Sequence, residues 1–242
     1  MSEGMVVRKC ADIEEFQRCV ELQKEIWGEA DIEVEPATLF VVASETGGQV
    51  LGAFDGERLV GYTLAVVGFL NGTVFLHSHM TGVLAEYRDR GVGRALKLAQ
   101  REEALGRGIR LVAWTFDPLE TRNAYFNLNR LGAISRKYLA NLYGVTTSPL
   151  HRGLPTDRLW VEWQLDSKRV AAAIANLAKE PPEGAALIEL PEVESRGSET
   201  AEKVQARIRE EFRRWFAKGY AAIGMRRTAA GAAYVLAPWS DF

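Results

Sequence analysis

Apolar residues recur at helical spacing in several segments of the chain, and residues that begin or end helices flank these segments. Asp12 is a predicted N-cap, and Glu15 is placed to complete a capping box with it. Gly91 precedes another such segment, which ends near two further glycines. The spacing predicts helices after Asp12, after Pro36 and after Gly91, and then over residues 121–131, 168–179 and 204–216.

Three apolar runs follow the second predicted helix, over residues 49–54, 58–69 and 73–84, and the dipeptides Asp55-Gly56 and Asn71-Gly72 separate them. Such dipeptides between apolar runs are strong hairpin signals, so the runs predict an antiparallel meander of three strands. Because helices and strands alternate after Gly91, we also expect a parallel strand pair with a crossover, and hence an α/β (α+β) fold. Other strands are predicted over residues 5–9, 110–116, 134–143, 159–165, 186–190, 220–227 and 232–237.

Length and charge narrow the classes of function. The chain has 242 residues, a formal net charge of −2 and two cysteines, and its N-terminus lacks the apolar region of a signal peptide. This composition excludes a disulfide-rich secreted scaffold and a membrane protein, gives no reason to expect nucleic-acid binding, and favours a cytoplasmic enzyme. The sequence changes character after Asp166. We therefore predict a main domain over residues 1–166 and a small α+β extension over residues 167–242.

One short motif stands between a predicted strand and a predicted helix: Arg88-Asp89-Arg90-Gly91-Val92-Gly93-Arg94. Two glycines at a helix N-terminus leave backbone N–H groups without a Cβ beside them, which is typical of a pyrophosphate site. The three arginines add cationic groups for phosphate. The motif is not a dinucleotide fingerprint, because Leu96 stands where that fingerprint has glycine, and it is not a Walker loop. Taken alone, the motif also fits a plain turn with a solvated basic edge.

Together with the elements around it, this motif resembles the Q/R-x-x-G-x-G/A loop of the GNAT superfamily of acyl-CoA-dependent N-acyltransferases. The resemblance covers residues 5–165, and its specific part covers residues 77–133. It implies a mixed, mostly antiparallel central sheet flanked by helices. It also implies that the backbone of Thr81, Gly82 and Val83 pairs with the pantetheine arm of coenzyme A. The phosphates would then be held by the residues of the loop, Arg88, Asp89, Arg90, Gly91, Val92, Gly93 and Arg94.

Two histidines lie just before this loop. His77 and His79 are two residues apart in one predicted strand, so both are expected to point to one face. Histidine has an unperturbed pKa of roughly 6.5, which suits it to remove the proton from a substrate ammonium near neutral pH. The run His-Ser-His-Met-Thr-Gly-Val also resembles the paired-histidine strand of the arylalkylamine N-acetyltransferases, which implies a relay with His79 nearer the acyl group. Two other interpretations stay open: satisfied interior polar groups, or two ligands of a metal.

The sequence departs from the family on the predicted helix before Gly132. Many members carry Asn and Tyr eleven and four residues before this glycine, where this chain has Thr121 and Leu128. Tyr125 lies three residues before Leu128 and could protonate the leaving thiolate, and a core residue or a wall of the substrate site is the other interpretation. Asn123 could replace the missing Asn as a cofactor-binding residue. The family's alternative base, a glutamate on the fifth strand, is also absent from the corresponding strand of this chain, which favours the histidines.

The prediction is therefore an enzyme that transfers an acyl group from acetyl-CoA, or from another acyl-CoA such as succinyl-CoA, to the primary amine of a small molecule such as an amino acid. The amine attacks the thioester directly in a ternary complex without a metal, and positioning supplies much of the rate. A non-catalytic coenzyme A sensor is the alternative from another class, favoured by the missing Tyr and Asn. Residues 167–242 are expected to form a lid or a contact within a homodimer.

Overall fold

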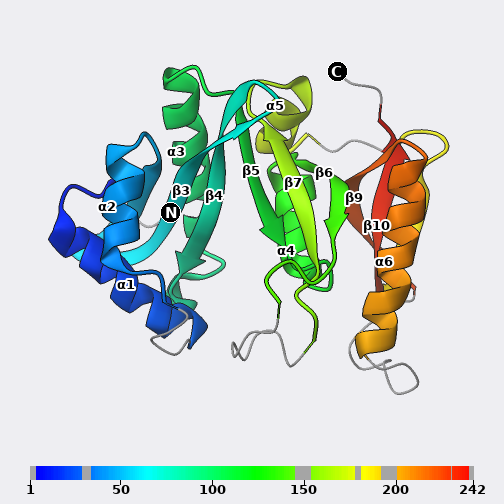
Figure 1. Cartoon of the computed structure of the whole chain (residues 1–242), viewed down its shortest axis with the longest axis horizontal. Coiled ribbons are helices and arrows are strands. Elements are labelled where there is room, and N and C mark those ends of the chain that lie inside the picture. Colours follow the sequence, from blue (N-terminus) through cyan, green and yellow to red (C-terminus); the bar gives the residue numbers. More distant parts are fainter. Residues whose placement is uncertain are drawn as a thin grey trace. The chain divides into compact units, whose positions relative to one another are not determined.

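The computed structural model of the protein describes residues 4–28, 34–144, 154–177, 181–191, 201–229 and 231–239. The chain divides into two compact units, unit 1 (Met1–Ala113 and Thr147–Arg152) and unit 2 (Trp114–Thr146 and Gly153–Phe242). The division falls within strand β5 (Leu111–Phe116), whose place in the chain Figure 1 shows. The predicted division into a main domain over residues 1–166 and an extension over residues 167–242 stays a prediction.

Unit 1 contains a sheet in the order β1-β2-β3-β4-β5. Its first four strands pair antiparallel in succession: β1 (Met5–Lys9), β2 (Gln49–Asp55), β3 (Arg58–Leu70) and β4 (Thr73–Val83). β4 then pairs in parallel with β5, at Leu76 with Val112 and at His77 with Ala113. The predicted meander and the predicted parallel crossover are therefore confirmed.

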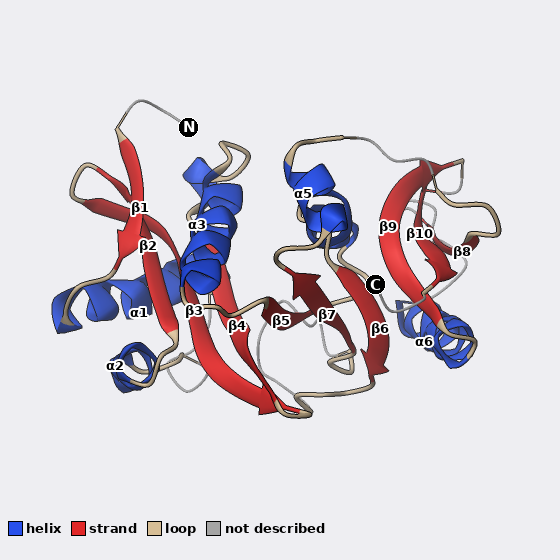
Figure 2. Ribbon diagram, turned by 90° about the horizontal axis from the view of Figure 1, so that it is seen from above, coloured by secondary structure: helices blue, strands red, loops and turns tan. Residues whose placement is uncertain are grey.

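Three helices cover the two faces of this sheet: α1 (Ile13–Trp27), α2 (Ala37–Glu45) and α3 (Val92–Gly106). Gly61 and Tyr62 are neighbours in β3 and therefore point to opposite faces. The Tyr62 ring contacts Trp27 of α1 and Phe40 of α2, with ring centroids 6.2 and 5.7 Å apart. A Cβ at Gly61 would instead lie 3.4 Å from Leu96 of α3. Thus α1 and α2 pack on one face of the sheet and α3 on the other, as Figure 2 shows.

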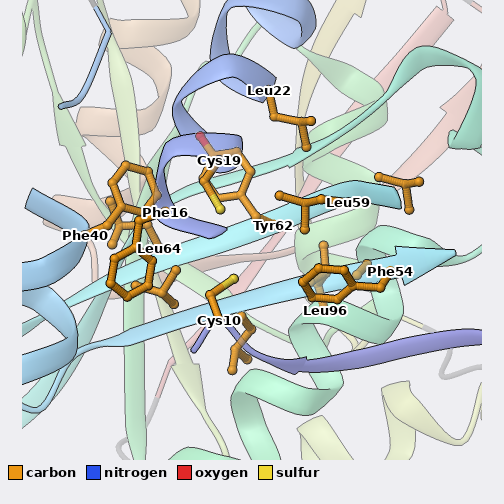
Figure 3. Packing of buried hydrophobic residues seen from close by; sticks show 14 of the residues in the cluster. Cys10, Phe16, Cys19, Leu22, Phe40, Phe54, Leu59, Tyr62, Leu64 and Leu96 are labelled. Atoms are coloured by element: carbon orange, nitrogen blue, oxygen red, sulfur yellow. The ribbon is translucent and has the colours of Figure 1, made fainter. Parts of the chain in front are cut away.

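The hydrophobic core of unit 1 forms where α1 and α2 meet the sheet (Figure 3). Phe16 of α1 stacks against Phe40 of α2, with ring centroids 6.3 Å apart. Cys19 follows Phe16 on the same side of α1 and is fully buried, as is Leu64 of β3. The predicted buried face of this first helix is therefore confirmed.

The N-terminus of α1 differs in detail from the predicted capping box. Asp12 is the N-cap, and its carboxylate accepts from the Glu15 N–H at 2.9 Å. The Glu15 carboxylate does not return to Asp12. It accepts from the Ala11 N–H at 2.8 Å and from the Arg8 guanidinium at 2.9 Å, and the ion pair with Arg8 lowers the pKa of Glu15 to about 2. The Glu15 carboxylate thus accepts from the N–H one residue before the N-cap, and it also pairs with Arg8 of β1.

Unit 2 contains the end of β5 and then the strands β7, β6, β9, β10 and β8 in that order. Its other elements are α4 (Thr121–Tyr125), β6 (Ile134–Leu139), β7 (Arg158–Gln164), α5 (Lys168–Ile174), β8 (Ala186–Pro191), α6 (Ala201–Ala217), β9 (Tyr220–Thr228) and β10 (Gly231–Pro238). The strand pairs β6–β7, β6–β9, β9–β10 and β8–β10 are antiparallel. Phe212 of α6 packs against Tyr138 of β6 and Tyr234 of β10, with ring centroids 5.6 and 4.9 Å apart. Both units thus have mostly antiparallel sheets with helices packed on them, which confirms the predicted fold class.

The predicted helix over residues 121–131 changes type within its length. It is α-helical to Tyr125 and then forms a π-helical turn over Phe126–Arg130. The Leu131 N–H donates to the Phe126 carbonyl at 3.0 Å, one residue beyond α-helical spacing. Apolar periodicity cannot distinguish this turn from a continuous α-helix, because one extra residue only rotates the buried stripe.

Two other predicted elements of unit 2 are shorter in the structure. β6 covers less than the predicted strand over residues 134–143, because Asn141 has a positive φ of 47° and its N–H donates to the Asp157 carboxylate at 2.9 Å. α5 covers the first part of the predicted helix over residues 168–179. The last part of that prediction, from residue 178, lies outside the described residues.

Candidate active site

Strand β4 carries both predicted histidines at a β-bulge. Two successive residues of β3 pair with Ser78 and Met80, so His79 is the extra residue of the bulge. His77 is half-buried, His79 is more exposed, and their ring centroids lie 6.2 Å apart. The rings thus lie close together, as expected for a common face. Bulges re-aim side chains and are common beside active sites.

The bulge lets neighbouring residues of β4 reach helices on different faces of the sheet. The Ser78 hydroxyl accepts from Nζ of Lys97 on α3 at 2.9 Å. The Met80 sulfur instead lies 3.7 Å from the hydroxyl of Tyr62, whose ring packs on the α1 and α2 side. In a regular strand Ser78 and Met80 would share one face. The local alternation of β4 therefore reverses at His79.

The environment of His77 disfavours its charged form. Burial lowers its pKa from 6.5 to about 4, and the nearby charges of His79 and Lys97 act in the same direction. A neutral imidazole can still donate and accept hydrogen bonds, but with this pKa it is a weak base at neutral pH. Of the two histidines, His79 is therefore the better candidate for accepting a proton.

Glu35 lies beside His79 and was not predicted as a site residue. Its Oε1 is 2.9 Å from Nε2 of His79. The two residues are 44 positions apart, and Glu35 precedes α2 in a segment without regular structure. No local pattern could reveal this contact, because it arises only when α1 and α2 pack on the face of the sheet that His79 faces.

Lys97 is a second residue near the histidines that the sequence analysis did not identify. Although it is a lysine, it is 4% exposed, and its Nζ donates to Ser78 Oγ at 2.9 Å and to Gln100 Oε1 at 2.8 Å. Burial lowers its pKa from 10.5 to about 7. The helical pattern does place residue 97 beside the buried Leu96, but lysine at such a position is ordinarily expected to extend to solvent.

The loop after β4 carries the predicted phosphate-binding motif, residues 88–94, which is called the anion cradle below. A short 3₁₀ turn (Ala85–Tyr87) precedes it, and Gly91 is the N-cap of α3 with a φ of +83°, a conformation that favours glycine. No side chain caps this helix end, so the first-turn N–H groups of α3 are not satisfied by a cap. Such an end attracts phosphate through its N–H groups and the helix dipole. The residues present therefore fit the pyrophosphate of an acyl-CoA.

The predicted phosphate-binding arginines have other contacts in this structure. The Arg88 guanidinium donates to the carbonyls of Val83 at 3.1 Å and Ile26 at 3.5 Å, and so ties the end of β4 to the end of α1. Arg90 lies over the ring of Tyr87, 5.4 Å from its centroid. Arg94 is half-buried in the first turn of α3. Their contacts to phosphate stay predictions.

The predicted pantetheine-binding residues form the end of β4. Thr81 hydrogen-bonds Thr63 of β3 through its hydroxyl at 2.9 Å. Gly82 faces α1, where a Cβ would lie 2.9 Å from side-chain atoms of Ile26 and Trp27. Glycine at this position therefore lets α1 pack closely against the strand that leads into the loop.

Tyr125 and Asn123 belong to unit 2. Tyr125, on α4, is 48% exposed, whereas Leu128 in the π-helical turn is fully buried. α-Helical spacing would place these two residues on one side of the helix, but in the structure they do not share a buried side. Oδ1 of Asn123 accepts from the side-chain Nδ2 of the buried Asn127 at 3.2 Å. The roles of Tyr125 and Asn123 stay predictions.

No group of three His, Cys, Asp or Glu side chains in the described part of the chain is arranged to hold a metal ion. Among the helices of the described ranges, none is both long and apolar enough to cross a membrane.

Residues 14–132 match the sequence model of the family described as acetyltransferase (GNAT). The chain belongs to this family. GNAT proteins are acyl-CoA-dependent N-acetyltransferases, and acetyl-CoA is their typical cosubstrate. The match includes β4, the anion cradle and α3, which are the elements that carried the predicted resemblance. No curated protein sequence matches the chain.

Solved structures share the GNAT fold with this chain at low identity. The ribosomal-protein-S18-alanine N-acetyltransferase from Escherichia coli is 13% identical with a TM-score of 0.53, and the match covers 67% of this chain and 95% of that one. A putative acetyltransferase from Salmonella typhimurium, solved with its cofactor acetyl-CoA, is 18% identical with a TM-score of 0.54, covering 68% and 96%. Naa50 from Arabidopsis thaliana is 14% identical with a TM-score of 0.51, covering 66% and 97%. These GNAT structures establish the fold, and about a third of this chain extends beyond it.

Proposed function

We propose that this GNAT protein transfers an acetyl group from acetyl-CoA to the primary amine of a small molecule such as an amino acid. Succinyl-CoA is the second candidate donor. The observation that carries the proposal lies within unit 1: β4 holds His79 at its bulge, and the loop after β4 leads to the N-terminus of α3, which no side chain caps. A base on β4 and an anion cradle in the loop that follows this strand support group transfer from a phosphate-bearing donor.

The anion cradle supplies binding and orientation. The N–H groups of the first turn of α3 would hold the pyrophosphate, with Arg90 and Arg94 close in sequence to add charge. The backbone of Thr81, Gly82 and Val83, between the bulge and the cradle, would pair with the pantetheine arm. This arrangement would direct the thioester toward the middle of β4, where His79 lies.

The chemistry requires a neutral amine. The proton of the substrate ammonium passes to His79, directly or through a water and the neutral His77. The amine nitrogen then attacks the acyl carbon, a C–N bond forms, and the C–S bond breaks as the electron pair leaves on the thiolate sulfur. A backbone N–H near Thr81–Val83 would stabilise the oxyanion formed during attack. As the intermediate collapses, the attacking nitrogen loses its second proton and the thiolate sulfur takes up one proton, so the products are the amide and free coenzyme A.

A substrate panel read by free-thiol release tests the proposal. The protein is mixed with acetyl-CoA or succinyl-CoA and with small amines, amino acids and peptides, and the acylated product is confirmed by mass. We expect release with at least one small primary amine, and His79→Ala should lower kcat by orders of magnitude while the KM for acetyl-CoA changes little. Coenzyme A binding without thiol release across the panel would contradict the proposal and support the sensor.

A matched pair of variants tests the anion cradle separately. At Gly93 a new Cβ would meet only Val83 within 4 Å, at an ordinary contact distance of 3.8 Å, so Gly93→Ala and Gly93→Asp should both fold. An aspartate near a helix N-terminus is favourable for the helix but repels phosphate. We expect Gly93→Asp to raise the KM for acetyl-CoA at least tenfold relative to Gly93→Ala, with little change in kcat. Equal KM values for the two variants would show that the pyrophosphate does not bind at this site.

A further inference from the structure

We propose that Glu35 is a positioning residue for His79, which it holds in the tautomer whose Nδ1 is free to take the substrate proton. This inference rests on the proposed function and deepens it. The contact that motivates it is the 2.9 Å distance between Glu35 Oε1 and His79 Nε2. An ionised carboxylate can only accept a hydrogen bond, so the shared hydrogen must belong to Nε2. In a neutral imidazole the remaining nitrogen, Nδ1, then carries the lone pair.

Glu35 is held in place by Gln23 of α1. The Glu35 N–H donates to Gln23 Oε1 at 2.9 Å, and Gln23 Nε2 donates to the Glu35 carbonyl at 3.0 Å. Gln23 is fully buried, so its amide is held by the packing of α1. The Gln23 amide thereby satisfies both the backbone N–H and the backbone carbonyl of Glu35, as a neighbouring strand would do in a sheet.

The residue after Glu35 adds a second constraint. Pro36 is the N-cap of α2, and its fixed φ of −73° limits the backbone between Glu35 and the helix. The Leu39 N–H donates to the Pro36 carbonyl at 2.9 Å, which closes the first turn. Glu35 therefore projects from a segment fixed on one side by Gln23 and on the other by α2.

The position of His79 explains why it needs a partner. As the extra residue of a bulge, His79 is not aligned by the regular pleat of β4, and it is half-exposed, with 32% of its side chain accessible. A partly exposed hydrogen bond contributes little to stability, so the value of this contact lies in orientation. When His79 accepts a proton, the carboxylate would also stabilise the imidazolium that forms.

A competing role for Glu35 makes a different kinetic prediction. Its carboxylate is 33% exposed and could bind the substrate ammonium directly instead of orienting His79. In that case, loss of the carboxylate would raise the KM for the amine and leave kcat unchanged. Under the positioning role, kcat falls and the ring of His79 changes its tautomer balance.

The test combines kinetics with ¹⁵N NMR of histidine-labelled protein in Glu35→Ala and Glu35→Gln. The chain has three histidines, and His79→Gln assigns the signals of His79. In wild-type protein we expect the Nε2–H tautomer. Glu35→Ala should shift these signals toward a mixture and lower kcat at least tenfold, with the KM for acetyl-CoA within twofold of wild type. Glu35→Gln, whose amide oxygen can still accept from Nε2, should keep the tautomer and lose less activity.

The control is Glu21→Ala, which removes an exposed carboxylate from α1 and should change neither readout. Unchanged His79 signals in Glu35→Ala would overturn the inference, and so would an effect confined to the KM for the amine. The NMR measurement needs no substrate. A protein that releases no thiol with any amine therefore overturns the proposed function, while the spectra still decide whether Glu35 sets the tautomer of His79.

Discussion

Lys97→Met removes a buried ammonium from the middle of unit 1 while keeping a long, flexible side chain. In the wild-type protein, Nζ of Lys97 donates to Ser78 and Gln100, and burial lowers its pKa from 10.5 to about 7. Methionine fills similar space but carries no titratable group. The variant therefore loses two hydrogen bonds at every pH, and in addition it loses the pH dependence that Lys97 gives to folding.

The size of this pH dependence follows from the lowered pKa. At about 1.4 kcal/mol per pKa unit, the difference between 10.5 and about 7 corresponds to roughly 5 kcal/mol. Between these pH values the unfolded chain binds the proton more tightly than the folded one, so the free energy of unfolding rises with pH. Between pH 6 and pH 10, Lys97 should add about 4 kcal/mol to the stability of the wild type.

Urea unfolding followed by circular dichroism measures this effect at a series of pH values. The free energy of unfolding of wild type minus that of Lys97→Met should rise by about 4 kcal/mol from pH 6 to pH 10. The control is Leu96→Val, which changes the neighbouring buried side chain and should cost the same at every pH. A difference between wild type and Lys97→Met that does not vary with pH would refute the reasoning, because Lys97 would then titrate alike in the folded and unfolded chains.

Three further predictions concern stability. As the pH falls from 6.5 to about 4, the free energy of unfolding of wild type should fall by roughly 3 kcal/mol because buried His77 must become charged, and His77→Gln should lack this loss. Urea unfolding at a series of pH values measures it, and an equal loss in wild type and His77→Gln would contradict it. Gly132→Ala should lower the thermal midpoint by several degrees, because Gly132 has a φ of +74° and a new Cβ would lie 2.8 Å from that of Ala173; an unchanged midpoint would contradict it. Asp157→Asn should cost about 3 kcal/mol in calorimetry, because the buried carboxylate accepts from Arg209 at 2.8 and 3.1 Å. A cost below about 1 kcal/mol would show that the Arg209 pair is not needed.

Unit 1 was predictable from the sequence because its signals are local. Asn71 and Gly72 have φ of 51° and 78°, the backbone that an Asn-Gly hairpin turn requires, so the dipeptide itself specified the β3–β4 connection. Gly91 likewise begins α3 in a left-handed conformation. In unit 2 the decisive interactions are longer in range. Asn141 ends β6 through a carboxylate 16 residues later in the chain, and periodicity carries no trace of such a contact.

The candidate site likewise combines residues that local sequence signals reveal with residues that only the fold brings together. The anion cradle is a contiguous motif whose backbone chemistry can be read from glycine spacing, and His77 and His79 are close enough in sequence for strand alternation to apply. Glu35 could not be found, because its partner is 44 residues away. Lys97 was missed for another reason: lysine is rarely buried, so general residue preferences argue against the position that the fold gives it.

The bulge at His79 is the feature that links these two missed residues. Without it, residues 78 and 80 would share a face of β4, and no single register would satisfy both Lys97 on α3 and Tyr62 on the opposite face. With it, Lys97 holds Ser78 from one face while Glu35 holds His79 from the other. Lys97 also lies on the helix whose N-terminus forms the anion cradle. The position of the candidate base is therefore tied, through Ser78 and α3, to the place where the phosphates would bind. Changes at Lys97 should consequently affect catalysis as well as stability, although Lys97 itself need never contact the substrate.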